Sequence, residues 1–144
     1  RMTEIFEYRK RSLYDFAKLV VEERAKRANS RYTEQCKEYI RKYYHQKIYI
    51  SDIAKALGIS ESHLSRIFKK ETGESIQEYS MHMRIERAEN LLKYSEASLT
   101  EISEYLCFSS QSHFGKVFKV HKNMTPKQYR DYYKSPEFVS REEI

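Results

Sequence analysis

The chain has 144 residues, of which 40% are hydrophobic and 33% are charged, and this length suits one small domain or two very small ones. No run approaches the roughly 20 apolar residues of a membrane-spanning helix, and no signal segment opens the chain, so a cytoplasmic protein without a membrane partner is expected. The 27 Lys and Arg residues against 21 Asp and Glu residues give a net charge of +6, which favours an anionic partner. A basic surface that only maintains solubility is the alternative.

The composition indicates an all-α protein, because Gly and Pro are scarce while apolar residues recur at three- and four-residue spacings. Cys36 and Cys107 lie far apart with no C-x-x-C motif, and the five histidines form no H-E-x-x-H motif. The sequence also lacks a glycine-rich phosphate loop. We therefore expect no enzymatic activity, no cofactor and no metal site.

The N-terminal part predicts two helices. Apolar residues between Thr3 and about Ala28 form one stripe of an amphipathic helix that is expected to end near residues 28–30. A second helix should begin near Thr33, with an apolar side formed by Cys36, Tyr39, Ile40 and Tyr43. Residues 1–30 have too little partner surface for a core, so we predict a linker or dimerisation helix that ends a missing upstream domain. A freely solvated arm is the alternative.

From residue 49 the chain repeats itself, because residues 49–79 align with residues 98–129. Matched residues are 49 apart in the first part of the alignment and 50 apart in the second: Ile53 with Ile102, Leu57 with Leu106, Leu64 with Phe114, Phe68 with Phe118, and Tyr79 with Tyr129. The second copy therefore has one extra residue, between Phe108 and Phe114. An insertion inside a helix would rotate its apolar stripe by about 100°, so the extra residue is predicted to lie in a turn.

Each copy predicts two helices joined by a short turn, which is the helix-turn-helix unit. In the first copy, Gly58 tolerates positive φ and Ser60 can cap the second helix. In the second copy, Ser98 and Glu101 are expected to form a capping box, and Ser110 is the expected cap of the second helix. The second helices should bury Leu64, Ile67 and Phe68 in one copy and Phe114, Val117 and Phe118 in the other.

Cys107 aligns with Gly58 at the turn of the second copy. A cysteine with positive φ costs about 1 kcal/mol. We expect the longer turn of the second copy to relax this requirement, and Cys107 to have a structural role rather than a redox role.

One helix of about 17 residues is predicted between the copies, within residues 75–94, because this stretch contains neither Gly nor Pro. Such a helix is about 26 Å long. With the turns at its ends it can hold the two units roughly one turn of DNA apart, about 34 Å.

The second helix of each unit carries a polar stripe opposite its apolar face. The two stripes consist of Glu61, Ser62, Ser65, Arg66 and Lys69, and of Gln111, Ser112, Gly115, Lys116 and Lys119. In a major groove, Arg66 can contact guanine through two bonds, Glu61 can accept from cytosine, and Gln111 suits adenine. An ordinary solvated helix face is the better explanation of one such stripe alone, but the repetition of the stripe in the second unit favours DNA. Gly115 costs about 1 kcal/mol inside a helix, so we expect a backbone to approach closely there.

These residues resemble the DNA-binding domain of AraC/XylS-family transcription regulators. The resemblance spans about residues 33–133 and rests most on HLSRIFKKETGESIQEY, RIERAENLL, SLTEISEYLCFSSQSHFGKVFK and TPKQYR. It implies an all-α, homeodomain-like tandem in which two helix-turn-helix subdomains are joined by a long linker helix. We expect these subdomains at residues 33–94 and 95–134, followed by a C-terminal tail at residues 135–144.

The resemblance implies a bacterial, sequence-specific regulator that binds a double-stranded DNA operator with two recognition helices in successive major grooves. Such proteins usually activate transcription by contacting RNA polymerase, in the cytoplasm and at the nucleoid, and a homodimer through residues 1–30 or an upstream domain is one arrangement. The implied base-reading positions are Glu61, Ser62, Ser65, Arg66, Gln111, Ser112, Gly115 and Lys116, and the expected phosphate contacts are Ser60, Lys69, Ser110, Lys119 and Thr125.

This sequence departs from the family pattern at several positions. Lys116 stands where arginine is commoner, which replaces a planar fork by a point charge. Asn123 replaces the glycine that ends the second recognition helix, a change that left-handed geometry tolerates. The rival interpretations are a single-strand or RNA binder and a helical protein-interaction module whose basic faces dock an acidic partner. Binding that weakens steeply with salt would favour DNA over a protein partner.

Overall fold

The computed structural model describes the backbone of residues 2–134 and the side chains of residues 9–134, so the expected tail at residues 135–144 lies outside the described residues. Within residues 2–134 the chain forms helices and no strands, which confirms the all-α prediction. The helices are α1 (Met2–Tyr43), α2 (Ile50–Leu57), α3 (Glu61–Thr72), α4 (Ile76–Tyr94), α5 (Leu99–Tyr105), α6 (Gln111–Lys122) and α7 (Pro126–Tyr133). None of these described helices is long and apolar enough to cross a membrane.

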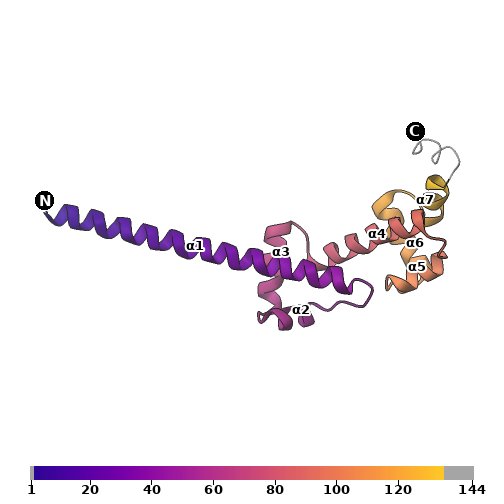
Figure 1. The fold of residues 1–144 in the computed structure, drawn as a ribbon, viewed down its shortest axis with the longest axis horizontal. Helices are drawn as coiled ribbons and strands as arrows, with labels where there is room; N and C mark the ends of the chain where they lie inside the picture. The colour runs from indigo at the N-terminus through magenta and orange to yellow at the C-terminus, as the bar shows by residue number, and fades with distance from the viewer. Residues whose placement is uncertain (1, 135–144) are drawn as a thin grey trace.

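Two groups of short helices are joined by α4, and α1 extends from the first group as a long rod (Figure 1). The first group contains α2 and α3, and the second contains α5, α6 and α7. We call them the first unit and the second unit. The linking helix α4 has 19 residues, close to the expected 17, and is about 28 Å long. This arrangement confirms the tandem fold that the repeat predicted.

The N-terminal part is one helix rather than two. α1 continues through the expected break at residues 28–30 and has 42 residues, a length of about 63 Å. The prediction was wrong because Ala28 is the best helix former and Asn29 and Ser30 each cost only about 0.5–0.7 kcal/mol relative to it. Between residues 9 and 27 the helix exposes most of its apolar side chains, such as Leu13 at 71% and Phe16 at 67%.

The first unit encloses its own core, which includes the C-terminal part of α1. Cys36 and Ile40 of α1 are fully buried there, as the sequence predicted. Burial raises the pKa of the Cys36 thiol to about 12, which fits a structural cysteine. The other buried members of this core are Ile53, Ala54, Leu64, Phe68 and Ile76. The first unit is thus built around the packed end of α1.

Hydrogen bonds at the helix ends fix both units in the predicted way. The side chains of Ser60 and Ser110 accept the backbone N–H groups of His63 and His113 at 3.1 and 3.0 Å, so both are N-caps. Ser98 accepts from the N–H of Glu101 at 3.1 Å, which is one half of the capping box expected there, whereas Thr125 and Gln128 form a complete reciprocal box. Asn123 ends α6 with a φ of 59°, the left-handed conformation expected of it.

Cys107 has a positive φ, as does its counterpart Gly58 in the first unit. Its φ is 61°, compared with 73° at Gly58, so the expectation of a relaxed turn was wrong. The physical reason is the position of the extra residue, Ser109, which lies after Phe108 and therefore after the left-handed residue. In both turns the left-handed residue donates to the carbonyl three residues earlier, at 3.2 Å for Gly58 and 3.1 Å for Cys107. The first half of the turn is therefore the same in both units.

The aromatic repeat in the sequence is also a repeat of geometry. The rings of Phe68 and Tyr79 meet edge to face with centroids 5.4 Å apart at 74°. The rings of Phe118 and Tyr129 meet at 5.2 Å and 78°. The same pair of residues thus holds each second helix against the helix that follows it.

Candidate nucleic-acid interface

The predicted stripe of the first unit lies on the outer face of α3. Leu64, Ile67 and Phe68 point into the core, which leaves the opposite side of this amphipathic helix in solvent. Ser65 is half-buried. The other four predicted residues are exposed, namely Glu61, Ser62, Arg66 and Lys69. The structure therefore brings the first set of predicted residues to one accessible surface.

The stripe of the second unit lies in the same way on α6. Phe114 and Phe118 are fully buried, while Gln111, Ser112, Lys116 and Lys119 are exposed. The side-chain oxygen of Gln111 accepts a hydrogen bond from the Thr100 hydroxyl at 2.6 Å. A carbonyl oxygen has a second lone pair and the amide NH2 still donates, so Gln111 retains what adenine recognition requires.

Gly115 occupies the middle of the second stripe. A Cβ atom added there would meet nothing within 4 Å, so packing inside the described chain does not require glycine. Helix propensity also disfavours it relative to alanine. The fold therefore gives no reason for glycine at this position.

The predicted phosphate contacts lie at helix ends. The oxygens of Ser60, Ser110 and Thr125 accept bonds from their own helices, which leaves each hydroxyl hydrogen available to an acceptor such as phosphate. Lys69 and Lys119 lie in the last turns of α3 and α6. The helix ends thus offer donors and positive charge next to both stripes.

A carboxylate that the sequence did not single out organises the second unit. Glu89 of α4 accepts hydrogen bonds from Lys122 and from the hydroxyl of Tyr129, both at 2.7 Å. Burial opposes ionisation of Glu89, but these two bonds outweigh it and lower the pKa of the carboxyl group. Lys122 is thereby used inside the unit rather than at its surface stripe.

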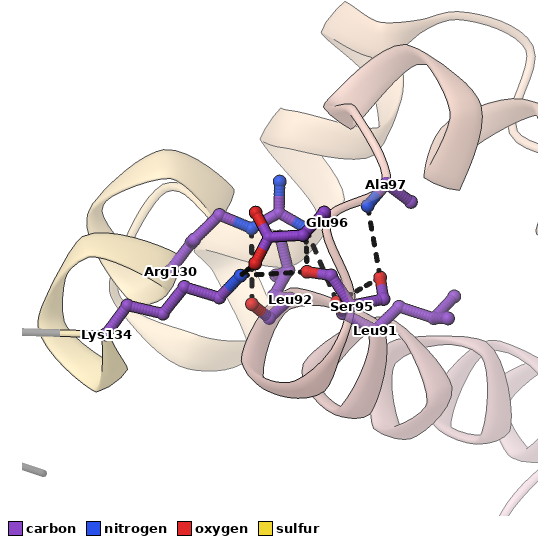
Figure 2. A network of polar contacts seen from close by, with 7 residues as sticks. All are labelled: Leu91, Leu92, Ser95, Glu96, Ala97, Arg130 and Lys134. Carbon is purple, nitrogen blue, oxygen red and sulfur yellow. Dashed lines mark hydrogen bonds and ion pairs between the residues drawn. The ribbon is translucent and has the colours of Figure 1, made fainter.

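Figure 2 shows a second contact that sequence reasoning missed, between α7 and the end of α4. The Arg130 guanidinium donates to the backbone oxygens of Leu92, Leu91 and Ser95 at 3.2, 3.4 and 3.3 Å. Lys134 donates to the Ser95 oxygen at 2.9 Å and to the Glu96 carboxylate at 2.7 Å. Because helix C-termini leave carbonyls unpaired, these cations cap α4 and fix the second unit on it. A basic residue in the TPKQYR motif was the only available signal.

Known proteins share the helix-turn-helix units of this chain. A family model for a helix-turn-helix domain matches residues 53–132. The Msm operon regulatory protein of Streptococcus mutans is 37% identical over 99 residues, which is 69% of this chain and 36% of that protein. The chain spans 12–36% of the length of the curated relatives that it matches.

Solved structures with the same fold include two regulators. The C-terminal domain of AraT, a response regulator from Geobacillus stearothermophilus, aligns with a TM-score of 0.67 and 30% identity, over 70% of this chain and 84% of that domain. A transcriptional regulator with an AraC-type DNA-binding domain from Chromobacterium violaceum aligns with a TM-score of 0.70 and 27% identity, over 74% of this chain and 96% of that one.

Proposed function

The chain belongs to the family of AraC-type helix-turn-helix transcription regulators, which are DNA-binding proteins rather than enzymes, and we propose that it reads double-stranded DNA through α3 and α6. The observation that carries this proposal is the exposure of equivalent polar stripes on both copies of the repeat. The length of α4, about 28 Å before its turns, suits recognition helices in successive major grooves about 34 Å apart. The proposal assigns residues 33–94 and 95–134 to the two subdomains.

The chemistry of the stripes suggests how bases are read. Arg66 presents a planar fork to guanine, and Gln111 presents an amide to adenine. Lys116 supplies a point charge in place of a fork, so it discriminates less between bases. The proposed base-reading positions are Glu61, Ser62, Ser65 and Arg66 on α3, and Gln111, Ser112, Gly115 and Lys116 on α6, where Gly115 has no side chain and allows close approach instead.

Contact with DNA would explain why glycine occupies position 115. Since no neighbour in the described chain would touch a Cβ there, close approach of the DNA backbone is a physical reason for glycine. The hydroxyls of Ser60, Ser110 and Thr125 and the ammonium groups of Lys69 and Lys119 supply the other phosphate contacts. Phosphate contacts position a protein on DNA without reading sequence.

The biological role is the further part of the proposal. It is a bacterial activator of transcription that acts in the cytoplasm, at the nucleoid, by contacting RNA polymerase. Residues 1–30 act as a linker and pair with a second copy in a homodimer. Leu13, Phe16 and Val20 support this pairing because they follow each other at spacings of three and four on α1, and Leu13 and Phe16 are more than 60% exposed. Sedimentation tests the proposed homodimer. The parent protein should sediment as a dimer and the Phe16→Arg variant as a monomer.

Selection of duplexes from a random pool tests the proposed function. Fluorescence anisotropy with the selected duplex then gives the salt dependence of binding. Four stripe cations, Arg66, Lys69, Lys116 and Lys119, predict that affinity falls roughly a hundredfold between about 50 and 200 mM salt. A pool without enrichment would contradict the proposal, and salt-independent capture of an acidic protein by the same faces would support the rival interpretation.

A further inference from the structure

The turn that follows α1 contacts the second unit directly, although α1 belongs to the first. Cys36 and Ile40 of α1 lie in the core of the first unit. Tyr44, four residues later, is 8% exposed and lies in the core of the second unit, beside Ile85 and Ala88 of α4. One helix and its turn therefore contribute to both cores.

The Tyr44 side chain is held by polar contacts as well as by packing. Its hydroxyl accepts a hydrogen bond from the Nε of Arg87 at 2.8 Å and lies 3.5 Å from the hydroxyl of Tyr105. The Arg87 guanidinium also stacks over the Tyr44 ring, 5.3 Å from its centroid. Tyr105 belongs to α5, so Tyr44 connects α1 with α4 and with the second unit at one point.

The backbone of the same turn is bound by side chains of α4 and of the second unit. Arg84 donates from Nε to the Tyr44 oxygen at 3.2 Å and from Nη2 to the Gln46 oxygen at 3.1 Å. The Cys107 thiol donates to the His45 oxygen at 3.0 Å. Three consecutive carbonyls in the turn that follows α1 thus accept bonds from residues 38 to 62 positions away.

We propose that these contacts are a clasp that fixes the orientation of α6 relative to α3 and thereby sets the spacing of the two half-sites on DNA. The clasp consists of Tyr44, Arg84, Arg87, Tyr105 and Cys107. The inference rests on the proposed function, because it concerns how the two recognition helices are placed on one duplex.

The two units are attached to each other at more than one point. α4 joins the units covalently, and at its C-terminal end Arg130 and Lys134 fix the second unit on it (Figure 2). A single rod permits rotation and bending between the bodies at its ends. The clasp adds a second attachment away from the axis of α4, which removes this freedom. Adjacent base pairs are about 3.4 Å apart, so a small rotation of the second unit changes the spacing that fits.

The clasp can be weakened without touching the stripes. Tyr44→Phe removes one oxygen and keeps the buried ring, and Arg87→Met removes the guanidinium on the exposed side. Arg41→Met is the matched control, because Arg41 carries the same charge on neighbouring α1 but pairs only with Glu38, at 3.8 Å, among the ion pairs of the described residues. Circular dichroism during heating verifies that all variants fold.

Binding to selected duplexes with altered spacing tests the proposal. The probes are the selected duplex, versions with one base pair added or removed between the half-sites, and a duplex with the first half-site alone. We expect the parent and Arg41→Met proteins to lose about tenfold or more in affinity when the spacing changes. The double variant Tyr44→Phe, Arg87→Met should lose less than about threefold, with unchanged affinity for the single half-site. Parental discrimination between spacings in the double variant would overturn the proposal.

A distance measurement without DNA separates this proposal from the proposed function. Glu71 of α3 and Val120 of α6 are exposed, and each can be replaced by a keto-bearing amino acid that takes a spin label without involving the cysteines. The distance between the two labels reports the distance between α3 and α6. We expect a narrow distance distribution in the parent protein and a broad one in the double variant. Equal widths would overturn the clasp even where the DNA selection succeeds, whereas a failed selection overturns the proposed function and its half-site spacing.

Discussion

The first and second units place different residues on the same backbone. Gly58 and Cys107 both adopt left-handed φ values, 73° and 61°, although only glycine does so without steric cost. Both donate to the carbonyl three residues earlier at nearly equal distances. The conformation of this turn is therefore imposed by its hydrogen bonds and by the packing of the two helices around it. The residue type affects stability, and the geometry stays the same.

The outer faces differ more than the turns do. Arg66 and Ser65 in the first stripe correspond to Lys116 and Gly115 in the second. The first stripe offers more donors with fixed geometry, and the second offers charge and close backbone approach. We expect the first unit to contribute most of the base discrimination and the second to contribute more of the affinity that does not depend on sequence.

The largest expected difference from the parent protein is the loss of stability when the core of either unit is truncated. Phe68→Ala and Phe118→Ala should each lower the free energy of unfolding by about 3–5 kcal/mol, because both rings are fully buried. The Phe118 variant should lie at the upper end, since that ring packs against both Phe114 and Tyr129. Urea denaturation measures the change, with Val120→Ala, at an 80% exposed position, as the control. A cost below about 1 kcal/mol in either variant would show that its unit can repack.

The next test concerns the stripes. Arg66→Ala should cost about 1–3 kcal/mol of binding and relax discrimination at one base pair. Lys116→Ala should reduce the slope of log affinity against log salt by about 1 and should relax discrimination at one base pair less than Arg66→Ala does, because a point charge reads a base less selectively than a planar fork. Anisotropy with single-base variants of the selected duplex measures both effects. Uniform weakening by Arg66→Ala would identify Arg66 as a phosphate contact.

Exchange of the turn residues tests the origin of their shared conformation. Gly58→Cys should lower the free energy of unfolding by about 1 kcal/mol, because a side chain is strained at positive φ. Cys107→Gly should relieve the same strain, offset by the lost thiol bond to His45, so that its net effect is smaller. Thermal unfolding of both variants gives the comparison. A gain in stability from Gly58→Cys would contradict this account of the turn.

Gly115→Ala should separate stability from binding. The variant should gain about 0.5–1 kcal/mol of stability, because alanine is the better helix former and its Cβ has open space. Binding to the selected duplex should weaken if DNA approaches this backbone. Ser65→Ala, at the matched position of the first stripe, is the control. It should bind the selected duplex with normal affinity and change only the preference for the base that it contacts. Unchanged affinity in Gly115→Ala would remove the proposed close approach.

The smallest expected effect is the pH dependence of the second unit. The bonds from Lys122 and Tyr129 lower the pKa of Glu89 in the folded protein below its unfolded value. This contribution to stability is present above the unfolded pKa and is lost as pH falls through the folded pKa. Acidification should therefore lower the protection of amides against hydrogen exchange, relative to their intrinsic rates at the same pH, more in α6 and α7 than in α2 and α3. Glu89→Gln should abolish that difference, and a difference that persists would assign it to other groups.

The sequence predicted those features that depend on local chemistry or on the repeat. Ser60, Ser110 and Thr125 cap helices because their hydroxyls lie next to unpaired N–H groups. The 49- and 50-residue offsets located the insertion near its true position at Ser109. They already placed it after Phe108 and therefore after Cys107, so the longer turn gave no reason for a relaxed φ at Cys107, and that φ was predicted wrongly.

The features that were missed depend on contacts between distant residues or on weak local preferences. Residues 28–30 looked like a helix end, but without Gly or Pro their small propensity differences do not interrupt a helix. The bonds from Arg130 to α4 and from Arg84 and Cys107 to the turn after α1 connect residues 35 to 62 positions apart. Such contacts leave no periodic pattern in a single sequence.

The continuity of α1 has a geometric consequence for anything that binds its N-terminal half. An α-helix cannot lengthen without breaking its hydrogen bonds, so a body held near Leu13 keeps a fixed rotational phase relative to Tyr44 in the second core. One added residue advances this phase by about 100°, whereas seven added residues restore it to within about 20°. A torque applied at one end of α1 therefore reaches the joint between the two recognition helices.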